Sequence, residues 1–172
     1  MSHPLDAFIS ESRRFLRDEY PAKLRRALAD ITEEDLWWRP NAACNSMGNL
    51  LLHLAGNLRQ WVVHGLGGRA DVRDRSSEFA RKGGLSPEEA LAALEKAVAD
   101  ADAVLAELDP AALLEPRTIQ GMPTTGLAAL YHVVEHFSMH TGQILQLVKI
   151  RRGRDLGFYS VDAQGKVTGT HW

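Results

Sequence analysis

The chain has 172 residues, of which 45% are hydrophobic and 24% charged, with a formal net charge of -2 at pH 7. This length suits a single domain over residues 1–172 that buries a core without disulfides. The balanced charge excludes the basic surface typical of nucleic-acid or anionic-membrane binding, and no apolar run reaches the roughly 18–20 residues that cross a bilayer. Cys44 has no second cysteine to pair with, and the N-terminus does not resemble a signal peptide, so we expect a cytoplasmic protein.

The first two segments with helical periodicity lie in the N-terminal part of the chain. One runs from about Leu5 to Ile31, with apolar residues three and four positions apart, as on one face of a helix. Pro21 lies inside it and predicts a kink or break near Tyr20, because proline lacks the N–H that a helix interior needs. The second runs from about Ser46 to Leu66, with Asn45 or Ser46 as its N-cap and glycines at its end.

Two further helical segments follow. Residues Ser86-Pro87-Glu88-Glu89 predict a helix start, with a serine cap, proline in the first turn and glutamate three positions after the cap; this helix stops near Pro110. The last helix runs from about Thr125 to Arg151 and ends in basic residues before Gly153. The four segments predict an all-α fold, a bundle of four antiparallel helices joined by crossover connections.

The connections carry few strand signals. Residues 117–120 and 158–161 are expected to be extended, but we expect neither stretch to build a sheet. The connection from Gly67 to Leu85 is long and polar, so it is expected either to be mobile or to lie over one end of the bundle. The tail after Gly153 has no helical period, and its aromatic residues predict that it packs back onto the domain.

Three of the seven histidines lie four residues apart in the last helix, at His132, His136 and His140. Four residues make about one turn, or roughly 6 Å along the axis, so neighbours in this series share a face and can bind one metal ion. The outer two lie about 12 Å apart, too far for one ion with bonds of about 2.1 Å. One adjacent pair is therefore the candidate, and the spacing does not decide which.

His53 is the natural third ligand. It lies mid-helix among leucines, and Asn49 and Asn57 extend a polar stripe one turn before and after it. Facing helices of a bundle bring such residues together with partners that are distant in sequence. The alternative is a core histidine that only satisfies its own hydrogen bonds. His64 is not interchangeable with His53, because it lies about 16 Å farther along the helix. Two more histidines, His3 and His171, lie near the termini.

The last helix also matches a different metal motif. His132, Glu135 and His136 fit the H-x-x-E-H pattern of inverzincin peptidases, whereas neither histidine pair fits the HExxH pattern of zincins. We rank the inverzincin alternative low, because a small four-helix chain offers little of a peptidase cleft. Glu135 also lies about 100° around the helix from His136, so we interpret it as a carboxylate at the surface or at an interface.

Two stretches of the chain resemble the DinB/YfiT-like superfamily of metal-dependent proteins. They are residues 45–57, NSMGNLLLHLAGN, and residues 135–144, EHFSMHTGQI. The preceding residues 36–40, LWWRP, are also similar to the lead into the family's second helix. The resemblance extends from the first helix to the end of the fourth, and H-x-G-Q-I is its most specific part.

The resemblance implies an up-down-down-up four-helix bundle that is usually a homodimer, with three histidines binding a divalent metal, often zinc or nickel. Carried over to this chain, the ligands are His53, His136 and His140. His132 is then one turn away and can line the pocket. Some relatives are thiol-dependent transferases or isomerases that use a low-molecular-weight thiol such as bacillithiol, mycothiol or glutathione. The implied partner is a small-molecule substrate.

Three imidazoles leave a bound ion with open positions, as in catalytic rather than structural sites. Asn57 and Gln143 lie on the histidine face and are candidates for contacts to the ligands or to substrate. Since no HExxH base is present, we expect thiol-dependent transferase chemistry on a small molecule, in which the metal activates the nucleophile. The alternatives are a metal-dependent hydrolase and a non-catalytic helical dimer that holds a metal or a small molecule. The sequence does not name the substrate, the metal or the thiol.

Overall fold

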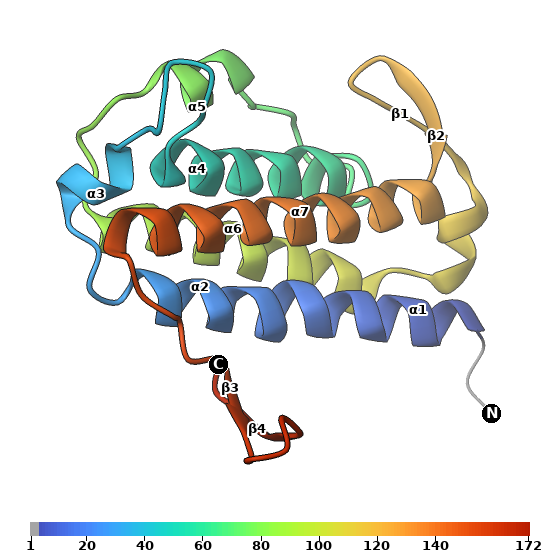
Figure 1. Ribbon diagram of the computed structural model, residues 1–172. Coiled ribbons are helices and arrows are strands. Elements are labelled where there is room, and N and C mark those ends of the chain that lie inside the picture. The colour runs from blue at the N-terminus through green and yellow to red at the C-terminus, as the bar shows by residue number, and fades with distance from the viewer. Residues whose placement is uncertain (1–3) are drawn as a thin grey trace.

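The computed structural model describes residues 4–172, and these are mostly helical (Figure 1). Four long helical segments, here called rods, make up most of the structure. The first rod consists of α1 (Pro4–Arg13), the π-helical segment η1 (Arg14–Glu19) and α2 (Tyr20–Leu28). Pro21 lies in the first turn of α2, directly after η1. In place of the predicted kink or break near Tyr20, the structure has this π-helical segment, whose wider turns accommodate a residue without an N–H.

The second rod consists of α4 (Met47–Leu58) and the π-helical segment η2 (Arg59–His64). Its N-cap is Ser46, one of the two predicted candidates. The Ser46 hydroxyl accepts a hydrogen bond from the Asn49 N–H, and Asn49 Oδ1 accepts one from the Ser46 N–H. This reciprocal pair satisfies donors that a helix start otherwise leaves open.

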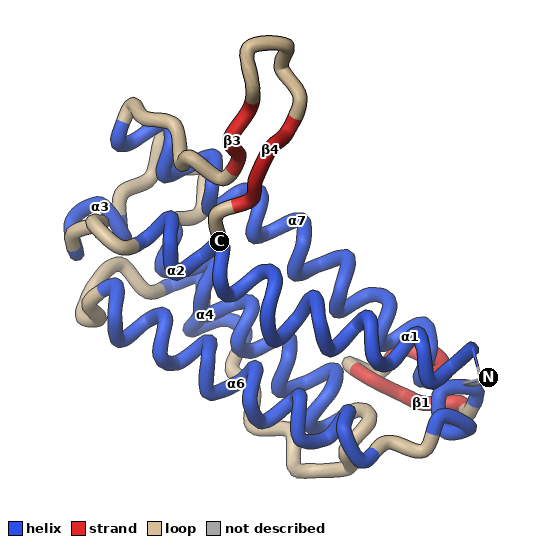
Figure 2. The backbone as a smooth tube through the Cα atoms, turned by 90° about the horizontal axis from the view of Figure 1, so that it is seen from below, coloured by secondary structure: helices blue, strands red, loops and turns tan. Residues whose placement is uncertain are grey.

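The other two rods are α6 (Pro87–Glu107) and α7 (Gly126–Arg152). The predicted capping box at Ser86 starts α6, and Gly153 ends α7 in the left-handed conformation with φ of 62°. The four rods lie side by side (Figures 1 and 2): α4 packs against α6 and α7, and α2 packs against the same two helices. Among residues 4–172, no helix has both the length and the apolar character needed to cross a membrane.

Shorter elements occupy the connections. They are α3 (Glu33–Trp37), α5 (Arg75–Ala80), the 3-10 helix η3 (Pro110–Leu114) and the strands β1 (Pro116–Ile119), β2 (Met122–Thr125), β3 (Tyr159–Val161) and β4 (Val167–Thr170). β1 pairs antiparallel with β2, and β3 with β4. The prediction that neither extended stretch builds a sheet is therefore wrong. Gln120 and Gly121, at φ of 55° and 72°, form a tight turn between β1 and β2, and such turns bring the following residues back into register.

The long connection and the C-terminal tail both contact the helices. α5, inside the connection, packs on α4. In the tail, Leu156 is buried, and Arg26 donates hydrogen bonds to the carbonyl oxygens of Leu156 and Gly157. The β3–β4 hairpin extends away from the rods (Figure 2). The tail therefore packs onto the domain at its base, while its hairpin projects.

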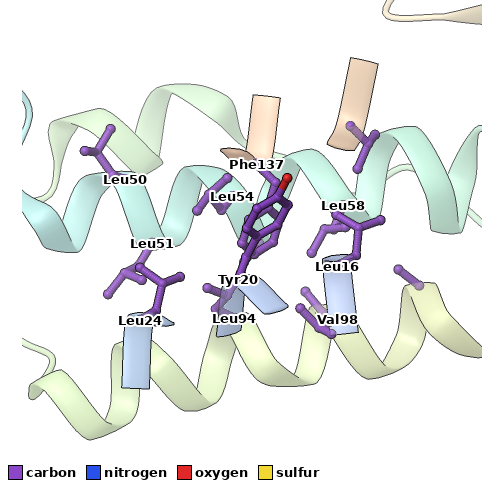
Figure 3. Packing of buried hydrophobic residues seen from close by; sticks show 14 of the residues in the cluster. Leu16, Tyr20, Leu24, Leu50, Leu51, Leu54, Leu58, Leu94, Val98 and Phe137 are labelled. Atoms are coloured by element: carbon purple, nitrogen blue, oxygen red, sulfur yellow. The ribbon is translucent and has the colours of Figure 1, made fainter. Parts of the chain in front are cut away.

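Apolar side chains from all four rods meet in one core (Figure 3). The ring of Tyr20 in α2 stacks on Phe137 in α7, with centroids 5.4 Å apart. The core side chains labelled in the figure are Leu16, Tyr20, Leu24, Leu50, Leu51, Leu54, Leu58, Leu94, Val98 and Phe137. This packing sets the relative position of α4 and α7, which carry the candidate histidines.

A cluster of ion pairs joins α3 to the end of α7. The buried Asp35 carboxylate accepts hydrogen bonds from Arg151 Nε at 2.6 Å and Arg152 Nη1 at 3.2 Å. Asp35 also forms a capping box with Thr32 at the start of α3. Burial raises the pKa of Asp35, but the hydrogen bonds from Arg151 and Thr32 outweigh burial and hold this pKa below its usual value. The cluster anchors the segment that leads into α4.

We expect Asp35→Asn to lower the free energy of unfolding at pH 7 by about 1–3 kcal/mol, because two buried hydrogen bonds to arginines lose their charged partner and one of its two acceptor oxygens becomes a donor. Since the folded pKa of Asp35 is lowered, its contribution is present above the unfolded value near 3.8 and is lost as pH falls through the folded value. Urea denaturation of variant and wild type should therefore converge toward low pH.

Glu34→Gln is the matched control, because Glu34 also pairs with Arg151 but is 85% exposed. We expect it to change the free energy of unfolding by less than about 0.5 kcal/mol. Equal losses in the two variants at pH 7 would contradict a particular role for the buried carboxylate.

Candidate metal centre

His53 from α4 meets His136 and His140 from α7 between the two helices. His136 Nε2 lies 3.1 Å from Nε2 of His53 and 3.1 Å from Nε2 of His140. Each of the three side chains offers one nitrogen that lies within 4.8 Å of the other two. Two ligands of a tetrahedral ion with bonds of about 2.1 Å lie about 3.4 Å apart. The three rings therefore converge closely enough to hold one ion.

The helices place these rings through ordinary packing. In α4, Leu51 and Leu54 are buried in the core, while His53 lies on the face toward α7 and is 5% exposed. In α7, His136 and His140 are one turn apart and so project from one face. His136 is 9% exposed. The cluster is thus built from two rigid elements and lies mostly out of solvent.

The outer ring nitrogens of His53 and His140 have oxygen partners. His53 Nδ1 donates to Glu78 Oε2 at 2.9 Å, and His140 Nδ1 donates to Gln143 Oε1 at 2.7 Å. A carboxylate and an amide oxygen accept hydrogen bonds, and Arg73 Nη2, which also lies near His53 Nδ1, donates to the same Glu78 oxygen. We therefore assign the ring protons to Nδ1 of both histidines. Nε2 of each ring then carries a lone pair directed toward His136.

This arrangement fits a cation better than it fits hydrogen bonds alone. His136 Nε2 lies equally close to two nitrogens that carry lone pairs, and one N–H serves only one of them. His136 Nδ1 is buried and has no hydrogen-bond partner among residues 4–172. A divalent cation would satisfy all three Nε2 atoms at once. Imidazole donors suit zinc and nickel.

Burial keeps the α7 histidines uncharged. It lowers the pKa of His136 to about 3, with further lowering from nearby His140 and His53. Burial also lowers the pKa of His140, against an opposing hydrogen bond to Gln143, and that of His132. Neutral imidazole is the form that binds a metal ion, so the protein holds these donors ready at neutral pH.

Arg73 and Glu78, from the long connection, support the cluster from outside. Arg73 donates from Nε to Glu78 Oε1 at 2.7 Å and from Nη2 to Glu78 Oε2 at 2.9 Å. Arg73 Nη2 also lies 3.0 Å from His53 Nδ1. Burial raises the pKa of Glu78, but hydrogen bonds from Arg73 and His53 outweigh burial, and the net shift is downward. Glu78 therefore stays a carboxylate and orients the His53 ring.

Neither Arg73 nor Glu78 is predicted from the sequence as part of the site. Charged residues are frequent in this connection, and nothing in their spacing marks one of them as the partner of a histidine on another element. The only sequence signal is general: a metal-binding histidine usually donates its second ring N–H to a carboxylate or carbonyl. That rule predicts that a partner exists but does not say which residue it is.

Asn49 and Gly56 allow the Glu78 carboxylate to come within hydrogen-bond distance of His53. The buried Asn49 side chain donates from Nδ2 to the carbonyl oxygens of Glu78 and Arg81, each at 2.8 Å, which ties α5 to the start of α4. Gly56 lies one turn after His53, and a Cβ there would be 2.0 Å from Glu78 Oε1. Asn49 thus positions the connection, and the missing side chain at 56 makes room for the carboxylate.

The other residues singled out in the sequence take different places. His132 lies outside the group of three, with its ring 5.2 Å from that of His136 and its Nε2 3.4 Å from Asn57 Nδ2. Gln143 contacts His140 as described above. Glu135 is exposed and does not join the histidines, so the H-x-x-E-H pattern forms no cluster among the described residues.

The remaining histidines have separate surroundings. His64 Nδ1 donates to the Arg69 carbonyl oxygen at 2.6 Å, and His171 Nε2 lies 2.6 Å from Ser160 Oγ. His3 lies outside the described residues. Neither His64 nor His171 belongs to the group of three that could hold a metal.

A sequence model of the DinB superfamily matches residues 18–144, a span that includes all three clustered histidines. The chain belongs to the DinB superfamily. The comparison with curated protein sequences gave no match.

Solved structures share the fold, among them two of DinB-like proteins. A conserved protein from Enterococcus faecalis is 18% identical, with a TM-score of 0.73 over 84% of this chain and 97% of that one. A DinB-like protein from Bacillus subtilis is 16% identical, with a TM-score of 0.63 over 84% and 93%. A DinB-like protein from Bacillus cereus ATCC 10987 is 15% identical, with a TM-score of 0.62 over 80% and 88%. At these identities the likeness concerns the fold.

We expect Gly56→Ala to destabilise the protein by about 1–3 kcal/mol, because the new methyl group displaces the Glu78 carboxylate. Gly142→Ala is the matched control, since a Cβ at that helical position meets nothing within 4 Å. Its higher helix propensity should stabilise the protein by up to about 1 kcal/mol. Chemical denaturation measures both effects, and a stabilising Gly56→Ala would show that Glu78 is not held against α4.

The lowered pKa of His136 predicts a pH-dependent stability of the metal-free protein. Below the unfolded value of 6.5 the unfolded chain binds protons that folded His136 does not, so the free energy of unfolding falls as pH decreases from 6.5 toward 3. Urea denaturation with a chelator at pH 7.5 and pH 5 measures this loss. His136→Gln should show a smaller loss than wild type, and an identical loss would contradict the assignment.

Proposed function

We propose that this protein binds one divalent metal ion, zinc or nickel, through His53, His136 and His140, and that the loaded site acts on a small molecule. The observation that carries the proposal is the position of His136 Nε2, 3.1 Å from two nitrogens whose lone pairs point toward it. Residues of α4 and α7 hold the ligands, and Glu78 and Gln143 orient two of the three rings. Membership of the DinB superfamily supports the same ligand set.

The proposed chemistry is transfer of a low-molecular-weight thiol to an electrophilic small molecule. A divalent ion with three imidazole ligands keeps open positions, at which it can lower the pKa of a bound water or hold a thiolate. The protein's own part is to keep the ligands neutral, to fix their ring orientation and to limit access of water to the buried rings. In the overall reaction the thiol sulfur forms a bond to carbon, the leaving group departs with its electron pair, and the thiol proton goes to solvent.

The positions of the carboxylates favour thiol transfer over hydrolysis. Metal-dependent hydrolysis of the zincin type needs a carboxylate base beside the metal. Among the described residues, Glu78 contacts the outer nitrogen of His53 and is already paired with Arg73. Glu135 is exposed. A thiolate activated by the ion itself needs no such base.

The same proposal includes the assembly and the location of the protein. We propose an up-down-down-up bundle of the family's type that forms a homodimer in the cytoplasm. Large apolar side chains exposed on α7 support an interface there: Tyr131 is 62% exposed and Ile150 is 54% exposed. The single cysteine suits a reducing compartment.

We expect elemental analysis of purified protein to find one zinc or nickel ion per chain in the wild type and a loss of that metal in His53→Ala, His136→Ala and His140→Ala. Each substitution removes one of three ligands, and two imidazoles hold an ion much more weakly. His64→Ala is the matched control, because His64 is a histidine of the same rod outside the cluster. Metal retained at full stoichiometry in His53→Ala would overturn the ligand set.

We expect metal-loaded protein to accelerate the reaction of bacillithiol, mycothiol or glutathione with an electrophile such as monochlorobimane. The acceleration should disappear with a chelator and in His136→Ala, and persist in His64→Ala. Fluorescence of the thioether product measures the rate. Full metal occupancy without acceleration by any thiol would instead favour the non-catalytic alternative, a dimer that holds a metal or a small molecule.

A further inference from the structure

A cavity lies beside the candidate metal centre, and Arg73 and Glu78 form part of its wall. It has a volume of about 870 Å³ and is formed by α4, the start of η2, the connection that carries α5, and α6. This volume lies in the range of small-molecule sites, about 300–1,000 Å³. None of the clustered histidines lines it. The cavity is therefore separate from the proposed metal site, although the two share one wall.

The charged residues of this cavity are predominantly basic. Arg59, Arg73, Arg81 and Lys96 line it, against Asp74 and Glu78. The whole chain has 20 basic and 22 acidic residues, so this local excess of positive charge departs from the average surface. The potential inside such a cavity attracts anions.

Both acidic side chains in the cavity wall already have partners. Glu78 accepts hydrogen bonds from Arg73 and His53 on its two oxygens. Asp74 Oδ1 accepts from the Ser76 hydroxyl and the Ser77 N–H at the start of α5. Within residues 4–172, neither carboxylate pairs with Arg59 or Arg81, so the charges of these two arginines are not neutralised by them.

In the described part of the chain, Arg59 and Arg81 donate hydrogen bonds only to carbonyl oxygens. Arg59 donates from Nη2 to the Ala93 oxygen at 3.2 Å. Arg81 donates from Nε and Nη2 to the oxygens of Gly83 and Gly84. Among residues 4–172, neither forms an ion pair. A guanidinium has five N–H donors and matches a carboxylate or phosphate in a two-bond arrangement, so both arginines keep donors for such a group.

The rest of the lining is small or apolar. Leu52 and Gly56 from α4 form part of the wall, together with Val72 and Ala80 from the connection. Val72 is 83% exposed, although it is a large apolar side chain. An occupant with a small apolar body would cover such surface and gain free energy from its burial.

We infer that this cavity binds a small organic anion, a carboxylate or phosphate attached to a short apolar body, with Arg59 and Arg81 as its principal partners. Lys96 adds charge at the rim, since its side chain is 71% exposed and pairs with Asp100. Arg73 is already engaged by Glu78 and contributes charge to the wall shared with His53. The binding requires no metal in the histidine cluster.

Isothermal titration calorimetry with the metal-free protein and a chelator tests this site. The probes are benzoate, phenyl phosphate and inorganic phosphate, with benzamide as the neutral analogue of benzoate. We expect benzoate or phenyl phosphate to bind more tightly than inorganic phosphate, and benzamide not to bind. Comparison of the first two probes identifies the preferred head group. Equal binding of benzamide and benzoate, or no binding of any anion, would overturn the inference.

Variants locate the binding on the cavity. Arg59→Gln and Arg81→Gln should each weaken binding about tenfold, since each removes hydrogen bonds to a charged group. Arg69→Gln makes the same charge change at an exposed position outside the cavity and should leave affinity within about twofold. Equal weakening by all three variants would show an effect of net charge alone and contradict the site.

Two further variants separate this inference from folding defects and from the metal proposal. Ser77→Glu adds a negative charge to the cavity wall while both arginines remain, and should weaken anion binding. Circular dichroism confirms that each variant is folded. His136→Ala should lose the metal but keep anion binding unchanged, because His136 does not line the cavity. Anion binding that is lost in His136→Ala would place the anion at the histidine cluster and overturn the separate site.

Discussion

The approach of His136 to both His53 and His140 is the contact on which the candidate centre depends. Nε2 of His136 lies 3.1 Å from each neighbouring Nε2, in a place where burial disfavours a charged imidazolium. The Nε2 lone pairs of His53 and His140 converge on His136, and one N–H of His136 can satisfy only one of them. The three Nε2 atoms are close enough together to hold one metal ion.

The support for this cluster comes mainly from the connection between α4 and α6. The backbone carbonyls of Glu78 and Arg81 are tied to Asn49 near the start of α4, and the Glu78 side chain then reaches His53 across Gly56. Arg73 keeps that carboxylate ionised. A segment without helical periodicity thus fixes the tautomer of one ligand, while Gln143, on α7 itself, does the same for His140.

The Arg73–Glu78 pair also connects two parts of the molecule with different chemistry. On one side it contacts a histidine of the cluster, and on the other it lines the basic cavity. The pair is almost fully buried, with side-chain exposures of 2% and 8%. Its charges and hydrogen bonds therefore lie in a low dielectric, where electrostatic effects are larger than in water.

Periodicity, caps and spacing in the sequence determined the four long helices, the start of α6 at its capping box and the candidate histidines of α4 and α7. These are local properties, since a cap or a face repeats within a few residues. The resemblance to the DinB superfamily chose His136 and His140 over His132, which spacing had left open. Only the tertiary structure decided that Glu78 and Arg73 contact the outer ring nitrogen of His53. It also decided that the π-helical segment η1 replaces a break at Pro21 and that two hairpins form. Partners brought together by packing leave no periodic trace in the chain, because their distance in space is set by the core and not by their separation in sequence.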